Sequence, residues 1–165
     1  MDGRTKSLVF QCPHARTRTA DGRRSEKHTS LTEGEDNSPM TAELDHLIVP
    51  TRDPAESAAF YRRVLGFAHE GRAGPFEILR VGPALTLDLM RQTPHDRMHL
   101  AFRLARAEFD RVYRFLCDSG MAFGGGPFDR SRHGPGQTFG AQGMAESLYF
   151  DDPDGHNIEV RCYEA

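Results

Sequence analysis

Two histidines and two carboxylates occupy matching places in the two halves of this 165-residue chain. His46 and His99 each lie in a short apolar segment, and Asp88 and Glu159 each lie between apolar residues of a later segment. Imidazole nitrogen and carboxylate oxygen together suit a divalent transition metal. A single histidine in a strand is more often simply hydrogen-bonded, and a single carboxylate is more often solvated. The duplicated arrangement is what favours a metal site, and we interpret these four residues as candidate ligands.

A repeated order of elements would position these residues. Each half opens with a strand-like segment that carries the histidine, continues with a helix that is apolar on one face, and reaches a terminating glycine. The pattern predicts the α+β class, with two βαβββ modules at about residues 43–92 and 96–164. Helices are expected at 55–65 and 107–119, strands at 66–70, 76–81, 84–91, 121–123, 147–150 and 156–163, and a Gly-rich loop at 124–146.

Alternation along the strands predicts that the four candidate ligands share the face turned away from the helices. The same parity places Met90, Arg103, Tyr149 and Arg161 on that face as candidate substrate-binding or catalytic residues. Two arginines in one cavity would suit an anionic small molecule, because guanidinium binds carboxylate or phosphate through two hydrogen bonds. The alternative is that both arginines pair with acidic residues or lie in solvent at the mouth.

Composition limits the remaining classes of function. Residues 1–40 have few large apolar side chains and no clear periodicity, which predicts a disordered tail before a folded domain at 41–165. A net charge of −3 gives nucleic-acid binding no electrostatic support. No apolar stretch is long enough for a membrane helix. Three cysteines without a CxxC motif favour reduced thiols and a cytoplasmic location.

The chain resembles the vicinal oxygen chelate superfamily, which includes glyoxalase I, extradiol dioxygenases, fosfomycin-modifying enzymes and bleomycin resistance proteins. The resemblance covers about 120 residues after Met40 and implies paired modules that close a U-shaped mixed sheet around a metal-binding cavity. It implies Mn, Fe, Ni, Co or Zn held by His46, His99 and Glu159, and in glyoxalase-like members also by Asp88. It is carried by LDHLIV at 44–49, FYRRVLGF at 60–67, HLAF at 99–102 and LYFDDPDGHNIE at 148–159.

Several functions remain open within this resemblance. We favour a glyoxalase-like lyase or isomerase, with Asp88 as fourth ligand or general base and Tyr149 as a further catalytic candidate. Glyoxalase-like members carry Glu where this chain has Asp88, which argues against glyoxalase I itself. An Fe(II) extradiol-type dioxygenase is an alternative, because residues 149–159 match the end of that signature. The acid–base histidine of the signature is missing from residues 140–142.

Binding without catalysis and thiol transfer would use the same fold for different chemistry. A non-catalytic small-molecule binding protein would confer resistance by sequestering an antibiotic. Thiol transfer to fosfomycin is disfavoured, because residues 41–165 contain no lysine and lack the potassium-binding loop that the resemblance would require. We expect a homodimer, because one pair of modules leaves sheet edges uncovered. The metal site could lie within one chain or between two chains.

Overall fold

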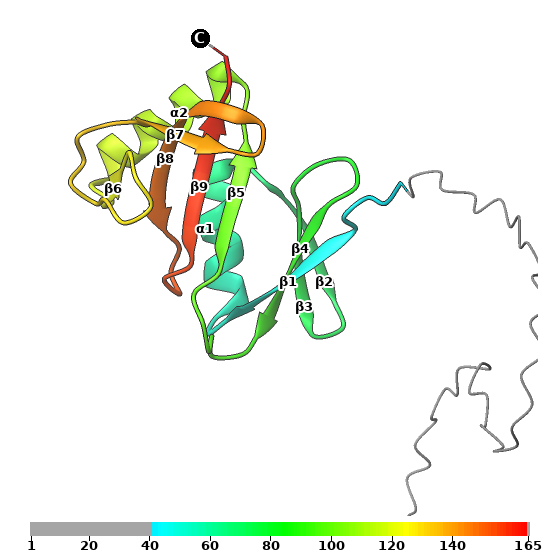
Figure 1. Cartoon of the computed structure of the whole chain (residues 1–165). Helices are drawn as coiled ribbons and strands as arrows, with labels where there is room; N and C mark the ends of the chain where they lie inside the picture. The colour runs from blue at the N-terminus through cyan, green and yellow to red at the C-terminus, as the bar shows by residue number, and fades with distance from the viewer. Residues whose placement is uncertain (1–40, 165) are drawn as a thin grey trace, which may run out of the picture. The chain divides into compact units, whose positions relative to one another are not determined.

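The computed structural model describes residues 41–164, so the tail expected at residues 1–40 lies outside the described residues. Two modules follow each other along the chain (Figure 1). In this part of the chain no helix is both long and apolar enough to cross a membrane. The first module comprises β1 (His46–Thr51), α1 (Pro54–Leu65), β2 (Ala68–Ala73), β3 (Phe76–Arg80) and β4 (Thr86–Arg91). The second comprises β5 (His99–Arg103), α2 (Arg106–Ser119), β6 (Phe123–Gly124), β7 (Gly136–Gly140), β8 (Gly143–Asp151) and β9 (Asn157–Cys162).

Each module forms its own mixed sheet. The first sheet has the order β1-β4-β3-β2, and the second has the order β5-β9-β8-β6 with β7 also paired to β8. β1 pairs with β4 in parallel, and β5 pairs with β9 in parallel in the same way. The predicted α+β class and paired modules are therefore confirmed.

Local sequence explains the bounds of α1. The Asp53 carboxylate accepts hydrogen bonds from the backbone N–H groups of Ala55 at 3.0 Å and Glu56 at 3.3 Å, and Pro54 occupies the first turn. Gly66 ends the helix in the left-handed region at φ 76°, where a side chain would be strained. This helix is fixed at both ends by residues that the sequence makes recognisable.

The two modules share one apolar core. Phe60 of α1 packs on Phe150 of β8, with ring centroids 6.3 Å apart, and α1 also contacts α2. Most of the helix-facing strand residues that alternation predicts are buried, whereas Leu47 and Leu85 are only partly buried. The buried residues include Val49, Leu87, Leu89, Leu100, Phe102, Ile158 and Val160.

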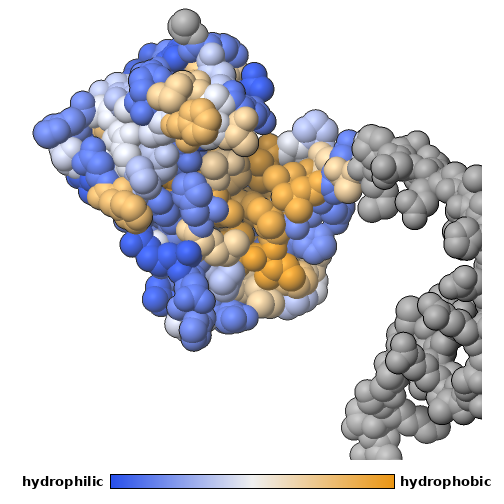
Figure 2. All heavy atoms as spheres, in the orientation of Figure 1, coloured by the Kyte–Doolittle hydropathy of each residue, from blue (hydrophilic) through white to orange (hydrophobic). Residues whose placement is uncertain are grey.

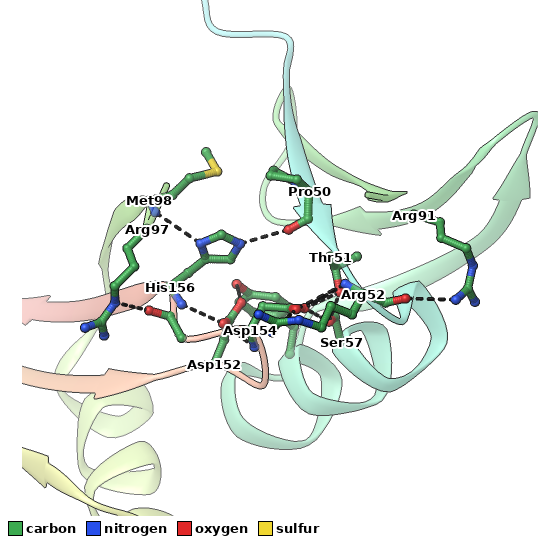
Figure 3. A network of polar contacts seen from close by, with 12 residues as sticks. Pro50, Thr51, Arg52, Ser57, Arg91, Arg97, Met98, Asp152, Asp154 and His156 are labelled. Carbon is green, nitrogen blue, oxygen red and sulfur yellow. Dashed lines mark hydrogen bonds and ion pairs between the residues drawn. The ribbon is translucent and has the colours of Figure 1, made fainter. Parts of the chain in front are cut away.

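A polar network joins the modules at the turn before β9 (Figure 3). The Met98 N–H donates to His156 Nδ1 at 3.1 Å, so Nε2–H donates to the Pro50 carbonyl at 2.9 Å. His156 is fully buried. Its ring connects β1, which carries His46, to the residue before His99. The module junction is therefore held by directional contacts as well as by the core.

Asp154 adds a second connection in this network (Figure 3). Its carboxylate accepts hydrogen bonds from the Thr51 hydroxyl, the Ser57 hydroxyl and the backbone N–H of Arg52. Burial raises the pKa of this carboxyl, but donation by Thr51 and Arg52 outweighs burial and holds the pKa below its ordinary value. Asp154 therefore stays ionised at neutral pH and ties the turn to β1 and α1.

The prediction of a Gly-rich loop at residues 124–146 is partly wrong. β7 forms within it, and β8 begins at Gly143, four residues before the expected start of that strand. Gly125 and Gly136 lie so close that a Cβ on Gly136 would stand 2.2 Å from the Gly125 carbonyl oxygen. The glycines thus permit a close backbone approach that brings β7 onto β8.

Candidate metal centre

His99 and Glu159 lie together on the outer face of the second sheet. His99 Nε2 is 3.2 Å from Glu159 Oε2. The Glu159 side chain is only 4% exposed, whereas that of His99 is half exposed. The His99 ring also packs on the Tyr149 ring, with centroids 6.2 Å apart. One buried carboxylate and one accessible imidazole therefore share a position from which both can bind the same ligand.

Hydroxyl groups surround the other oxygen of Glu159. Oε1 accepts hydrogen bonds from Tyr149 at 2.8 Å and from Ser147 at 3.0 Å, and Thr138 Oγ1 lies 3.4 Å from it. Arg161 Nε lies 3.5 Å from the same oxygen. Burial raises the pKa of the Tyr149 phenol and the neighbouring Glu159 raises it further, so Tyr149 is a neutral donor at ordinary pH. Ser147 and Thr138 were not predicted as site residues, because neither has a ligand's chemistry or a recognisable spacing.

His46 and Asp88 form the corresponding pair on the first sheet. Asp88 is registered with Ile48, two residues after His46, and Glu159 is registered with Ala101, two residues after His99. The two pairs are thus equivalent in the repeat. Asp88 accepts one hydrogen bond, from the Thr86 hydroxyl at 2.8 Å.

His46 and Asp88 have fewer polar neighbours than His99 and Glu159. A hydrogen bond to Asp45 raises the pKa of the exposed His46, partial desolvation opposes this, and the nearby Asp88 charge raises the pKa further. The strands on either side of β4 place Ile48 of β1 and Ile78 of β3 next to Asp88. The position of Ile78 corresponds to that of Tyr149, so Asp88 lacks the phenol that holds Glu159.

The described chain does not bring the two pairs together. Among residues 41–164, no three His, Cys, Asp or Glu side chains are placed to hold one metal ion. Apolar surface gathers over β1 and neighbouring strands of the first sheet (Figure 2). Ile48 there is 43% exposed and Leu44 is 58% exposed. The first sheet therefore presents an uncovered apolar face that includes two candidate ligands.

A cavity of about 610 Å³ opens over the second pair. His99, Glu159 and Tyr149 line it, and Phe128 and Phe139 line it with exposed rings. Alternation could not have indicated either phenylalanine, since one follows β6 in a loop and the other lies in the unforeseen β7. The remaining lining residues are Arg97, Met98, Pro127, Arg130, Asp151, Asn157 and Arg161.

Most positive charge in this cavity already has a partner. Arg97 and Arg130 both contact Asp151 at 2.7 Å. Arg161 lines the cavity, but its Nη2 donates to the backbone carbonyls of Thr138 at 3.0 Å and Gly143 at 3.3 Å.

The other two predicted substrate residues lie elsewhere. Arg103 lies over the Tyr163 ring, 5.2 Å from its centroid, and lines a separate pocket. Met90 belongs to the first sheet, where it is registered with Pro50 and Phe76. Of the three predicted substrate residues, only Arg161 lines the cavity over Glu159.

The donor pair on the second sheet fits half of a metal centre. Two adjacent ligand atoms on an octahedral or tetrahedral ion, each about 2.1 Å from it, are separated by about 3.0–3.4 Å. The 3.2 Å between His99 Nε2 and Glu159 Oε2 falls in that range. A nitrogen and an ionised oxygen also match the preference of first-row divalent metals. The remaining ligands of such an ion would come from outside this pair.

Comparison with known proteins identifies the family and agrees with the fold. A family model described as Glyoxalase/Bleomycin resistance protein/Dioxygenase superfamily matches residues 43–160. Metallothiol transferase FosB of Bacillus licheniformis is 28% identical over 123 residues, covering 71% of this chain and 73% of that protein. Glutathione transferase FosA of Serratia marcescens is 28% identical over 130 residues, covering 73% and 81%. The solved structure of Oxidase ChaP-H2 superposes with a TM-score of 0.67 at 27% identity, covering 76% of this chain and 96% of that one.

Proposed function

Because the chain belongs to the Glyoxalase/Bleomycin resistance protein/Dioxygenase superfamily, we propose that it is a metal-dependent enzyme acting on a small molecule with adjacent oxygen atoms. The reaction we favour is that of a glyoxalase-like lyase or isomerase. The equivalent placement of two His–carboxylate pairs in the repeat carries this proposal. His46, His99 and Glu159 would supply two nitrogens and one oxygen to one divalent ion of the Mn, Fe, Co, Ni or Zn series, with Asp88 as a fourth ligand or as a base.

We propose that the complete site forms between two copies of the chain. Exposed Ile48 lies two residues after His46 and in register with Asp88 on the apolar face of the first sheet, and His99 and Glu159 line an open cavity. A second copy that covers the apolar face with its own cavity would join the two pairs. A twofold dimer would then contain two such sites, each built from the first module of one chain and the second module of the other.

The two carboxylates would have different tasks. Glu159 is buried and saturated with donors at Oε1, which suits a permanent ligand. Asp88 accepts one hydrogen bond and is flanked by Ile48 and Ile78, which suits a base that takes a proton from a substrate carbon. A bound divalent metal would supply Lewis-acid stabilisation to the negative charge that develops on the substrate oxygens. Tyr149 would keep Glu159 in place by hydrogen bonding.

Mixing two variants tests the shared site. In a heterodimer of His46→Ala and His99→Ala chains, one site carries both changes and the other carries neither. Random pairing makes about half of the dimers mixed, so about one quarter of the wild-type number of intact sites should return. Equilibrium dialysis against Mn²⁺, with each variant alone as the control, measures that number. If mixing restores no metal sites, the cross-chain arrangement is excluded.

Asp88→Asn then tests the assignment of the base. The variant should retain its metal and lose about 100-fold or more of proton exchange, because an amide cannot accept the proton. Solvent deuterium exchange into the hemithioacetal of methylglyoxal with a thiol is the assay. Loss of metal in Asp88→Asn would identify Asp88 as a ligand. Metal-free wild-type protein that still binds an apolar drug would identify a binding protein instead.

A second candidate is an Fe(II)-dependent oxidation, which the likeness to Oxidase ChaP-H2 favours. Oxygen consumption with catechols after Fe²⁺ reconstitution would support it, and proton exchange without oxygen uptake would exclude it. Thiol transfer is a third candidate reaction, because the relatives FosB and FosA are named as thiol and glutathione transferases. Thiol consumption in the presence of fosfomycin tests that reaction directly.

A further inference from the structure

The hydroxyl groups around Glu159 include one that the repeat does not provide. Tyr149 and Ser147 come from β8, the strand next to Glu159. Thr138 comes from β7, where it pairs with Ala145 beyond the position at which the β2–β3 hairpin of the first module turns, between Ala73 and Phe76. Thr138 Oγ1 lies 2.7 Å from Ser147 Oγ, and Ser147 Oγ lies 3.0 Å from Glu159 Oε1. The longer β7–β8 hairpin therefore places a hydroxyl at the back of a candidate ligand.

The supply of protons fixes the direction of these hydrogen bonds. Each hydroxyl has one proton to donate and can also accept. When Ser147 donates to Glu159, its oxygen is free to accept from Thr138, so the two form a short chain that ends on Oε1. Tyr149 donates to the same oxygen at 2.8 Å. A carboxylate oxygen has about two lone-pair sites. Oε1 is therefore saturated, and Oε2 is the oxygen left to face His99.

We infer that Thr138 and Ser147 are positioning residues that make Glu159 a one-oxygen ligand and thereby select small divalent cations over Ca²⁺. This inference rests on the proposed metal site. Ca²⁺ takes six to eight oxygens, often with a carboxylate that binds through both of its oxygens. Such binding requires Oε1 to release its donors. Smaller first-row metals need one oxygen and one imidazole from this sheet.

The first module shows what the same position looks like without these groups. Among the described residues, Asp88 accepts only from the Thr86 hydroxyl, on Oδ1, and Ile78 stands where the second module has Tyr149. The hydroxyl chain is thus specific to one of two equivalent carboxylates. A general need for strand packing would not by itself create that difference.

Metal titration of the full-length protein tests the inference. Mn²⁺ affinity is measured from the EPR signal of free Mn²⁺, and Ca²⁺ affinity from competition with Mn²⁺. Ser147→Ala and Thr138→Val should each weaken Mn²⁺ binding by about 10-fold or more. Both should also lower the Mn²⁺/Ca²⁺ affinity ratio, since Oε1 becomes available. Thr138→Ser, which keeps the hydroxyl, should restore both values, and Ser119→Ala on the exposed end of α2 should leave them unchanged.

The possible outcomes separate the two proposals. Wild-type protein that binds no Mn²⁺ would overturn the metal site and this inference together. Wild-type binding with unchanged affinity and unchanged ratio in both variants would overturn the inference only. Loss of Mn²⁺ affinity with an unchanged ratio would overturn the selection of small cations. Circular dichroism identifies a variant that fails to fold, and the partly exposed Thr138 position then supplies the result if the buried Ser147→Ala is lost.

Discussion

Replacing Asp154 with Asn should destabilise the junction between the modules more than its position in a turn would indicate. The Asp154 side chain is 3% exposed and accepts hydrogen bonds from Thr51, Ser57 and the Arg52 backbone. An Asn amide at this place removes the charge and replaces one of the two accepting oxygens with an NH₂ group. The guanidinium of Arg52 contributes little to the loss, because that side chain is 60% exposed.

The expected size of the loss follows from the groups left without an acceptor. The hydroxyls of Thr51 and Ser57 lie 2.6 Å apart and can still bond to each other. One donor, the Arg52 N–H or a hydroxyl proton, then faces the amide NH₂ and loses its acceptor, at about 1–3 kcal/mol, and the bonds to the remaining oxygen lose the added strength of a charged acceptor, about 1 kcal/mol. We expect the free energy of unfolding to fall by about 3 kcal/mol and the midpoint of thermal unfolding by about 10 °C.

The sign of the pH dependence is a second check on this variant. Because the folded-state pKa of Asp154 is lowered, its contribution is fully present above the unfolded-state pKa of about 3.9. It is lost as the pH falls through the lower folded-state value. Urea unfolding followed by circular dichroism should thus show a difference between wild type and Asp154→Asn that is constant above about pH 5 and shrinks on acidification.

The matched control is Asp96→Asn, since the Asp96 side chain is 89% exposed. This control should leave the midpoint of unfolding unchanged at every pH. A loss below about 1 kcal/mol in Asp154→Asn at pH 7 would refute the reasoning, because a single unpaired buried donor already costs that much. A difference that does not shrink on acidification would also refute it, since the charge would then not be responsible.

Two further changes test other parts of the fold. Gly136→Ala should cost about 1–3 kcal/mol in urea unfolding, because the new Cβ would meet the Gly125 carbonyl oxygen at 2.2 Å, whereas Gly82→Ala, with open space around it, should be neutral. Tyr61→Phe should cost about 1–2 kcal/mol, because the buried phenol donates to Asp152 at 2.8 Å, and an unchanged midpoint of thermal unfolding would show that this bond contributes nothing.

Strand alternation predicted which residues share a face, because that property depends only on neighbours in the sequence. It correctly separated His46 and Asp88 from the buried Val49 and Leu89. It could not predict how the two sheets are oriented relative to each other, since that depends on how the helices pack. The sequence therefore predicted two equivalent pairs of side chains but not their separation within the described chain.

Contacts between segments far apart in the chain could not be predicted from the sequence either. His156 is fully buried, and its ring is satisfied there by a hydrogen bond to the Pro50 carbonyl, 106 residues away. β7 was missed because it begins and ends in glycine and has an exposed Phe139, which reverses the usual pattern of a half-buried strand. The contribution of Thr138 to the Glu159 position follows from that strand alone.

The separation of the two His–carboxylate pairs has a thermodynamic consequence. If one ion requires ligands from two chains, metal binding and self-association are linked equilibria, and each strengthens the other. The apparent metal affinity would then rise with protein concentration, and dilution would release metal. Below the dimer dissociation constant, the number of working sites would grow with the square of the chain concentration. Modest changes in expression would then alter the catalytic capacity of a cell more than proportionally.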